Sequence, residues 1–336
     1  LTTSSAFNNA VRPQGFHYNY EVDSRSVAVF FGFNEFSIGE NSSVFGDLRL
    51  EHNEYSYDNK ILSGNTSDDG TVCGFGGCYY SRPEDREDNF EEVSFRLGVE
   101  REIDFLTLFS QVSMGFRPPQ MTELYRLQKK QIVGDIDSEK LVMLEIGSRF
   151  STEYFEGSLS LYLGKKKDSI FRDAENFIQD HGKTNHKGLE LFTRLEINET
   201  NSLFLAGTFQ NHKYDFSSET SMKEKINSGN YVDTSPKTSF NLRWVNLLSD
   251  NMKYEMEVER MGSYYTDAAN LHKYEGHTLI HSRFVYFSRD NLTQFIRIHN
   301  LLGEDYAERA DFNAFGGDRY FPGLPRQIYF GLEYAF

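Results

Sequence analysis

The stretch that decides the fold is Met252-Lys253-Tyr254-Glu255-Met256-Glu257-Val258-Glu259, in which apolar and charged side chains alternate without a break. Successive side chains of a β-strand point to opposite faces, so this pattern predicts a strand with one apolar and one charged face. The same alternation recurs in about 13 segments of the chain, each about 10–15 residues long. Soluble proteins mostly use strands of about 5–6 residues, so this length favours strands that cross a membrane.

The connections between these segments are alternately short and long. Short links lie near 36–43, 101–103, 151–154, 197–200, 247–251 and 288–290. Long links lie near 58–88, 117–138, 172–183, 217–234, 265–277 and 302–325. A transmembrane β-barrel has short periplasmic turns at one rim and long extracellular loops at the other. The sequence therefore predicts an all-β protein, a transmembrane antiparallel β-barrel of the bacterial outer membrane.

The two faces of the predicted strands fit such a barrel. One face is mainly apolar and would meet lipid, whereas the charged face would line the lumen. The lumen-facing charges are Asp47, Arg49, Glu51, Arg96, Glu100, Glu145, Arg149, Glu190, Arg194, Glu196, Arg243, Glu255, Glu257, Glu259 and Arg297. In the last strand, Glu333 should face the lumen. The residues of that strand that should face lipid are Ile328, Phe330, Leu332, Tyr334 and Phe336.

Composition excludes several other classes of protein. The 336 residues contain no apolar run of about 18 residues, so no transmembrane helix is predicted. The 30 Phe and 20 Tyr, against one Trp, suit the aromatic girdles of a barrel. A formal net charge of −15 argues against nucleic-acid binding, which needs clustered Lys and Arg. No nucleophile elbow, helical zinc-ligand pair or phosphate loop is present, so we predict neither an enzyme nor a bound cofactor.

Cys73 and Cys78 are the two cysteines of the chain and lie in a Gly-rich stretch. Their closeness predicts one local disulfide, and with it an oxidising compartment. Two free thiols or half of a metal site are the alternatives. Several histidines lie at predicted loop or strand ends, where their spacing does not gather ligands as it would on a helix. We therefore predict no metal site.

Four motifs in the chain resemble those of TonB-dependent outer-membrane receptors. The most specific is Gly-Phe-Arg-Pro-Pro-Gln-Met-Thr-Glu-Leu-Tyr at 115–125, similar to the family's Gly-Phe-Arg-(Ala/Pro)-Pro…Glu-Leu-Tyr signature at the extracellular end of a strand. The others lie at 186–191, 299–307 and 317–326, in the family's order. The resemblance implies that residues 1–336 are the C-terminal part of a receptor barrel domain. This part would supply about 13 strands of a barrel of about 22.

Two hallmarks of the family, the N-terminal plug domain and the energy-coupling TonB box, are not found in the sequence. Bacterial barrels have even strand numbers, so an odd count also suggests that earlier strands are missing, and the resemblance implies that the plug is not part of this chain. The resemblance implies three partners: the TonB complex, reached through the missing plug domain; outer-membrane lipids; and the barrel assembly machinery, which would recognise the terminal aromatic Phe336. It favours plug docking as the role of the lumen charges, over a merely solvated interior.

The function implied by the resemblance is active transport of a scarce ligand, with a ferric siderophore as the expected one. Haem is less favoured, because residues 117–140 contain no His and lack the Asn-Pro-Asn-Leu element of haem receptors. A passive porin or a structural outer-membrane barrel is the alternative. An outer-membrane enzyme would need a catalytic set that the sequence does not offer.

Five residues at predicted loops are candidate ligand-binding residues. Arg117 is in phase with lumen-facing Gln111 and Ser113 and sits where an anionic ferric chelate would enter. The planar guanidinium suits anionic oxygen ligands, although a structural role that bonds the loop is an equal alternative. The other four candidates, by their place in loops, are Arg82, Arg172, Arg319 and Tyr320.

Overall fold

The computed structural model of the chain describes most of its residues. These are 2–3, 16–18, 20–59, 80–81, 83–125, 127–128, 131, 135–172, 177–219, 225–288, 291–313 and 316–334. Within them, one antiparallel sheet of 13 strands dominates the structure, which confirms the predicted strand number and the all-β fold class. No helix in the described part of the chain is both long and apolar enough to cross a membrane.

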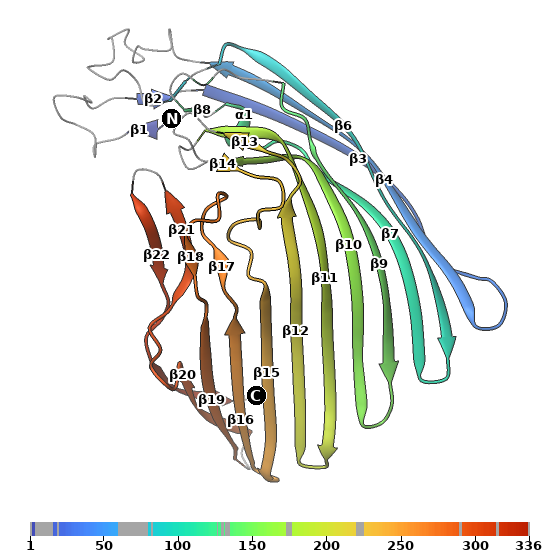
Figure 1. Cartoon of the computed structure of the whole chain (residues 1–336). Coiled ribbons are helices and arrows are strands. Elements are labelled where there is room, and N and C mark those ends of the chain that lie inside the picture. Colours follow the sequence, from blue (N-terminus) through green and yellow to red (C-terminus); the bar gives the residue numbers. More distant parts are fainter. Residues whose placement is uncertain are drawn as a thin grey trace.

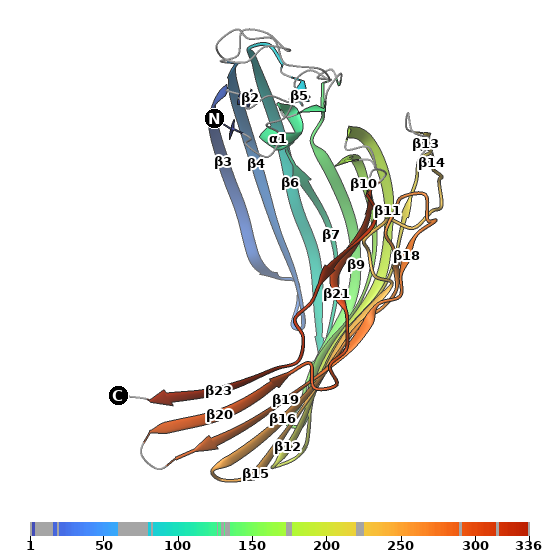
Figure 2. The ribbon, with the colours of Figure 1, turned by 90° about the vertical axis from the view of Figure 1, so that its left-hand side faces the viewer.

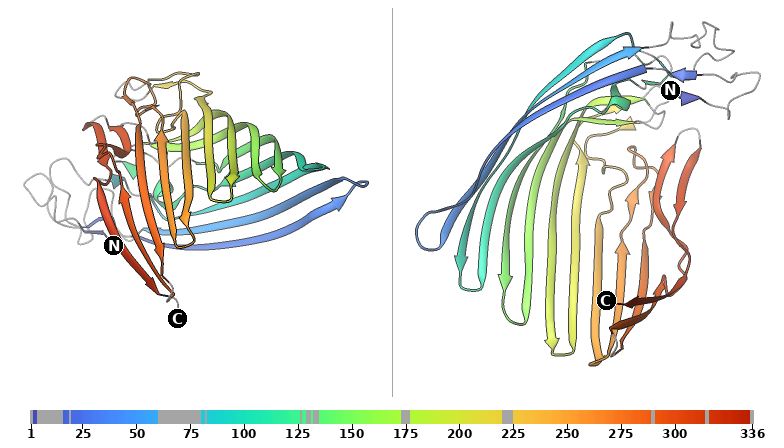
Figure 3. Two further views of the ribbon diagram at one scale, coloured as in Figure 1. Left: turned by 90° about the horizontal axis from the view of Figure 1, so that it is seen from below. Right: turned by 180° about the vertical axis from the view of Figure 1, so that it is seen from behind.

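The 13 strands of the sheet follow one another in chain order, each paired with its sequence neighbours (Figure 1). They are β3 (Tyr20–Ser37), β4 (Ser42–Asn59), β6 (Arg86–Ile103), β7 (Leu106–Arg117), β9 (Glu139–Ser151), β10 (Phe155–Arg172), β11 (Ile178–Asn198), β12 (Asn201–Tyr214), β15 (Thr238–Ser249), β16 (Met252–Met261), β19 (His277–Phe287), β20 (Leu292–His299) and β23 (Gln327–Tyr334). β3 and β23 form the two edges, so the sheet is open. Figure 3 shows how the sheet curls around a concave face.

Short turns join the strands at one end of the sheet and longer connections join them at the other, as predicted. The longer connections carry the small elements α1 (Met121–Leu124), β5 (Tyr80–Ser81), β8 (Leu127–Gln128), β13 (Ser218–Glu219), β14 (Lys225–Ile226), β17 (Tyr264–Tyr265), β18 (Lys273–Tyr274), β21 (Ala307–Asn313) and β22 (Gly317–Pro322). Two further short strands, β1 (Thr2–Thr3) and β2 (Phe16–Tyr18), pair near the N-terminus. We call the end with the longer connections the extracellular end, because barrels place their long loops there.

One connection is much shorter than predicted. The long link expected at 172–183 shrinks to residues 173–177, because β10 and β11 stay paired up to Arg172 opposite Ile178. The pairing shifts register between Lys166 and Phe171, and both Asp168 (φ 54°) and His181 (φ 59°) adopt positive φ there. Such bulges insert an extra residue and break the period of two, so the sequence pattern ends before the strands do.

The register sorts side chains onto the two faces of the sheet as the alternation predicts. Leu161 lies opposite Ile146 on one side and Leu189 on the other. Leu161 and Ile146 remain 56% and 55% exposed, and they belong to a broad band of exposed apolar side chains. A contiguous exposed apolar surface of this kind suits contact with lipid, so we call this the outer face. Glu190, one residue beyond Leu189, lies on the opposite, inner face.

The terminal strand follows the same rule. Ile328 and Phe330 lie opposite Ile298 and Ile296 on the outer face, with Ile328 69% exposed. Leu332 and Tyr334 share that face by the period of two, whereas Glu333 lies opposite Thr293 on the inner face. The predicted orientation of these residues is therefore found in the structure. Phe336 falls outside the described residues.

Among the described residues, buried apolar clusters form where the longer connections fold back onto the sheet. Leu124 and Tyr125, in and just after α1, are 0% and 2% exposed and pack with Tyr57 of β4 and Phe90 of β6. Figure 2 shows α1 lying against these strands near the extracellular end. The long connection after β7 therefore turns inward over the inner face, and this placement positions the candidate site.

Candidate functional site

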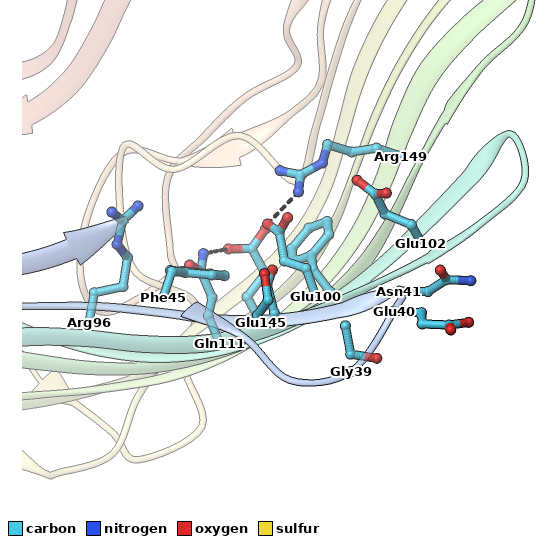
Figure 4. A pocket seen from close by; sticks show the side chains of 14 residues that line it. Gly39, Glu40, Asn41, Phe45, Arg96, Glu100, Glu102, Gln111, Glu145 and Arg149 are labelled. Carbon is cyan, nitrogen blue, oxygen red and sulfur yellow. Dashed lines mark hydrogen bonds and ion pairs between the residues drawn. The ribbon is translucent and has the colours of Figure 1, made fainter. Parts of the chain in front are cut away.

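The inner face near the short turns carries a hollow of about 490 Å³ (Figure 4). Its lining is mostly polar and includes Glu40, Glu100, Glu102, Gln111, Glu145 and Arg149. Gln111 Nε2 donates a hydrogen bond of 2.6 Å to Glu145, and Arg149 forms an ion pair with Glu100. This wall is solvated and carries side chains of both positive and negative charge. It can therefore bind a polar surface, and it does not form an apolar cavity.

Aromatic side chains stiffen this wall. Phe45 of β4 lies opposite Gly98 of the neighbouring strand β6, and a Cβ atom at Gly98 would clash with the Phe45 ring. The Arg96 guanidinium lies 5.3 Å from the centre of the same ring and donates to Asp47 at 2.9 Å. Glycine is therefore required where the ring folds flat against the neighbouring strand, and the ring in turn supports the arginine.

At the extracellular end, Arg117 is held by two carboxylates. Its Nε donates to Glu139 at 2.6 Å, and its Nη1 and Nη2 donate to the two oxygens of Glu123 at 2.9 and 3.1 Å. The fork geometry of the bond to Glu123 is the bidentate kind that arginine makes with carboxylates. All three guanidinium nitrogens of Arg117 thus donate to carboxylates of the protein, which supports the structural role weighed for Arg117 in the sequence analysis.

Glu139 is the centre of this cluster and is almost completely buried. Its side chain is 6% exposed and accepts from Lys166 Nζ at 2.8 Å, from the Ile170 backbone N–H at 2.8 Å and from Ser169 Oγ at 3.2 Å. These donors come from β10, whereas Arg117 ends β7. The carboxylate therefore fastens three neighbouring strands at the point where the loop leaves the sheet.

Two of the predicted arginines meet around α1. Glu123 of α1 accepts the Gln120 backbone N–H at 2.7 Å in a capping box, in addition to the bonds from Arg117. Arg172 reaches the same helix from β10, and its Nη2 lies 3.4 Å from the Thr122 carbonyl oxygen. Both arginines thus help to fix the loop that covers the inner face.

Tyr125 anchors the end of this helix. Its phenol donates to Asp88 Oδ2 at 2.7 Å, and its ring stacks on Tyr57 with 4.4 Å between ring centres. Burial, together with the bond to Asp88, raises the pKa of the Tyr125 phenol above its ordinary value. The phenol therefore remains protonated and continues to donate to the carboxylate at physiological pH.

The hairpin of β21 and β22 brings the other predicted pair, Arg319 and Tyr320, to the extracellular end (Figure 1). Asp311 accepts from Arg319 Nε at 2.6 Å and from Arg309 Nη2 at 2.7 Å. Two guanidinium groups share one carboxylate, so the cluster keeps one positive charge in excess. Arg309, Arg319 and Tyr320 are 65%, 48% and 57% exposed, which leaves them open to a ligand from outside.

The sequence-predicted residues thus fall into separate places. Arg117 and Arg172 meet at α1, and Arg319 and Tyr320 are neighbours on β22. Within the described residues, no hydrogen bond or ion pair joins these two groups. Arg82, Cys73 and Cys78 lie outside the described residues, so the predicted disulfide stays a prediction.

Sequence reasoning missed the acidic partners and the second arginine of the hairpin. Glu123 could have been found, because Gln120 and Glu123 are spaced as in a capping box. Glu139 lies opposite Arg117 only through the pairing of β7 with β9, and Asp311 is set opposite Arg319 only by the pairing of β21 with β22. No local pattern in the sequence indicates those two pairings.

Histidines form close pairs on the inner face. His186 and His212 lie 4.5 Å apart between ring centres, and His212 Nε2 is 3.1 Å from the Tyr162 hydroxyl. His281 stacks on His299 at 4.4 Å. In the part of the chain that the structure describes, no group of three or more His, Cys, Asp or Glu residues is arranged to hold a metal ion.

A half-buried carboxyl group in the extracellular connections predicts a pH dependence. The Asp233 side chain accepts a hydrogen bond from the Tyr214 phenol. Burial raises the pKa of the Asp233 carboxyl, and the carboxylates of Asp267 and Asp311 raise it further. For a carboxyl whose pKa is raised on folding, the stabilisation is present below the unfolded-state pKa and is lost as pH rises through the folded-state pKa.

The Asn side chain of Asp233→Asn is neutral at every pH. We therefore expect the Tm of this variant to rise relative to that of the wild type as pH increases from about 4. The difference in Tm should grow to about 1–2 °C for each kcal/mol, because the unfolding entropy of about 2.1 cal/mol/K per residue is summed over 336 residues. Thermal unfolding between pH 4 and pH 8 measures it. The exposed turn residue Asp250, changed to Asn, is the matched control for the loss of one carboxyl group. An Asp233→Asn curve parallel to the wild type would contradict the assignment.

Comparison with known proteins identifies the family of this chain and several solved structures with a similar fold. The family model for the TonB-dependent receptor-like β-barrel matches residues 2–301. No curated protein matches the sequence. The fold is similar to the ferric-catecholate import receptor Fiu of Escherichia coli K12 (TM-score 0.75, 16% identity), covering 95% of this chain and 46% of that one.

Two other solved structures are similar to the same extent. The siderophore receptor PiuA of Acinetobacter baumannii gives a TM-score of 0.74 at 14% identity, over 93% of this chain and 43% of that one. The copper transporter OprC gives 0.75 at 15% identity, over 94% and 48%. The chain therefore spans less than half the length of each of these three proteins. At such identities the likeness concerns the fold alone.

Proposed function

The chain belongs to the TonB-dependent receptor family and to the bacterial outer membrane, and from this premise we propose that it is the barrel part of an active-transport receptor for a ferric siderophore. Transport would be energised by the TonB complex through a plug domain inside the barrel. The observation that carries the choice of ligand is the excess positive charge of the Arg309–Asp311–Arg319 cluster at the extracellular end, in a chain of net charge −15.

The chemistry of that cluster suits a ferric chelate that carries negative charge. Each guanidinium keeps free N–H donors beside the bond to Asp311, and guanidinium groups bind anionic oxygens with well-defined geometry. Tyr320 lies opposite Ala310, on the other face of the hairpin from Arg319, with its ring centred 6.3 Å from that of Tyr274, so it is not part of this surface. Two of the similar proteins named above are described as a ferric-catecholate and a siderophore receptor, which supports the same class of ligand.

The inner face supports the idea of a plug. Arg194 lies in the row of lumen charges and donates to Glu196 at 2.7 Å, while the hollow of Figure 4 presents Glu100, Glu145 and Arg149 toward the concave side. These charges already pair with one another and stay partly exposed, so a polar plug surface of complementary charge could bond them without leaving a charge unpaired. We propose that this wall contacts the plug.

Removing both arginines should weaken binding strongly. Because each charge-assisted hydrogen bond contributes about 1.5–3 kcal/mol, we expect the double variant Arg309→Ala/Arg319→Ala to bind a ferric catecholate at least about 100-fold more weakly. Either single variant should lose less, since the other guanidinium remains. Titration of purified protein with ⁵⁵Fe-labelled ferric catecholate, ferric citrate and a ferric hydroxamate measures this.

The control is Lys225→Ala, which removes an extracellular cation that already pairs with Glu219. Uptake of the same chelates into iron-starved cells, with and without a protonophore, tests energisation. Uptake that persists with the protonophore would indicate a passive porin. Failure of all three chelates to bind would refute the siderophore as ligand.

A further inference from the structure

A cluster of lysines interrupts the apolar outer face near its extracellular end. Lys165 on β10 lies opposite Val142 and Asn185, and Lys187 on β11 lies opposite Leu163. Leu163 and Leu144 are themselves paired on the outer face, so the register places both lysines on the face that meets lipid. Lys167 lies two residues beyond Lys165 on the same face. All three lysines are exposed.

These lysines have no acidic partner. Among the described residues, no carboxylate lies within ion-pair distance of Lys165, Lys167 or Lys187, in contrast to Lys140 nearby, whose Nζ is 3.4 Å from Glu92. Lys213 of β12 lies opposite Asn185 and extends the cluster, with its Nζ 4.9 Å from the centre of the Tyr231 ring. Unpaired ammonium groups gathered on adjacent strands create a positive surface patch.

The patch borders an apolar groove. One hollow of about 880 Å³ is lined by these lysines together with Val112, Met114, Val142, Leu144 and Leu163, and Asp215 is its single carboxylate. A second hollow of about 590 Å³ continues it over Ile146, Leu161, Leu189 and Phe209. Leu144, Leu163 and Lys187 line both hollows. The outer face therefore offers a continuous apolar groove that ends in positive charge.

The cluster is local and is not a general feature of the extracellular end. On β4 and β6, the corresponding outer positions carry Glu54 and Glu91, and His52 faces Glu91 at 3.9 Å. Lysines that merely extend toward water at a membrane surface would be distributed around the barrel. Their concentration on β10, β11 and β12 calls for a ligand with matching charge.

We propose that this surface binds a phosphorylated lipid of the outer leaflet, with its acyl chains in the groove and its phosphate groups on Lys165, Lys167 and Lys187. Charge complementarity selects the phosphates, because ammonium groups without acidic partners form charge-assisted hydrogen bonds with them. The apolar floor of the groove favours a lipid over a free anion. Transfer of acyl chains from water into the groove lowers the free energy, whereas a phosphate ion has no apolar surface to bury. The site is on the outer face and is independent of the transported ligand.

The test compares two triple variants of equal charge. Lys165→Gln/Lys167→Gln/Lys187→Gln removes the patch, and Lys225→Gln/Lys253→Gln/Lys273→Gln removes three lysines that pair with Glu219, Glu255 and Glu275. Delipidated protein in detergent is titrated with diphosphoryl lipid A, and bound lipid is counted by native mass spectrometry. Each lysine near an anionic lipid increases the affinity about fivefold. The patch variant, which lacks three lysines, should therefore bind lipid A about 100-fold more weakly, and the control should match the wild type.

Further arms separate lipid from phosphate and binding from folding. Phosphatidylcholine should bind wild type and patch variant alike, and inorganic phosphate at millimolar concentration should not displace lipid A. The variant Lys165→Arg/Lys167→Arg/Lys187→Arg keeps the charge and should keep the affinity, while heat-modifiable migration confirms that each variant is folded. Equal lipid A affinity in folded patch variant and control would overturn the proposal, as would complete displacement by inorganic phosphate.

Discussion

Replacing Leu161 by arginine is expected to abolish most assembly of the protein into the outer membrane. Leu161 is 56% exposed on the outer face and lies between Ile146 and Leu189. An arginine on the lipid face of a barrel costs about 2–4 kcal/mol at the midplane of the bilayer. Glu190→Arg, on the inner face of the next strand, keeps its charge in water and should assemble nearly as well as the wild type.

The terminal strand offers a second matched pair. Leu332→Arg places a charge among lipid-facing residues, whereas Glu333→Arg replaces one lumen charge by another. Leu332 lies nearer the short turns than Leu161 does along its own strand, so its defect should be the smaller of the two. The folded fraction of outer-membrane protein is measured by heat-modifiable migration in gels. If either leucine variant folds as well as its glutamate counterpart, the assignment of faces is wrong.

Removing the buried carboxylate of Glu139 is expected to be the most destabilising change at the extracellular end. Glu139→Ala leaves Arg117 and Lys166 without their shared partner and the Ile170 N–H without an acceptor. Leaving buried charges unpaired costs about 3–5 kcal/mol. Because Arg117 and Lys166 are 35% and 29% exposed and Arg117 keeps Glu123, we expect the lower figure, about 3 kcal/mol.

Glu139→Ala should lower both the stability of the whole protein and the local stability of the loop that contains α1. With its anchor gone, the loop that contains α1 should become sensitive to limited proteolysis, while guanidinium unfolding reports the change in free energy. Glu100→Ala is the control, because in the described part of the chain Glu100 pairs only with the half-exposed Arg149 and such pairs contribute about 1 kcal/mol or less. A Glu139 variant as stable and as protease-resistant as the Glu100 variant would show that the cluster does not fasten the loop.

The hydrogen bonds around α1 favour a structural role for Arg117 over a ligand-binding one. The sequence left open whether Arg117 binds an anionic ligand or bonds the loop, and in the structure its guanidinium bonds Glu139 and Glu123. By contrast, Arg319 shares Asp311 with Arg309 and retains exposed surface. This contrast is the reason why we propose the β21–β22 hairpin, and not the Gly-Phe-Arg-Pro-Pro motif, as the place of ligand binding.

The sequence by itself determined the strands, their number and their faces. Side chains of a strand point alternately to its two sides, so the run at 252–259 separates the residues of one face from those of the other, and strand length together with the alternating connections assigns the apolar face to lipid. The lengths of the connections then fix the two rims. These are properties of consecutive residues, and they failed only at 172–183, where bulges at Asp168 and His181 interrupt the alternation.

Only the tertiary structure decided which charges meet. Arg117 finds Glu139 through the register of β7 on β9, and Lys187 joins Lys165 through the register of β11 on β10. Register depends on the turns and bulges of paired strands, and a shift of one residue would move each side chain to the other face. The alternation of residues along one strand carries no information about its partner's register, so the anchor at α1 and the lysine patch could not be read from the sequence.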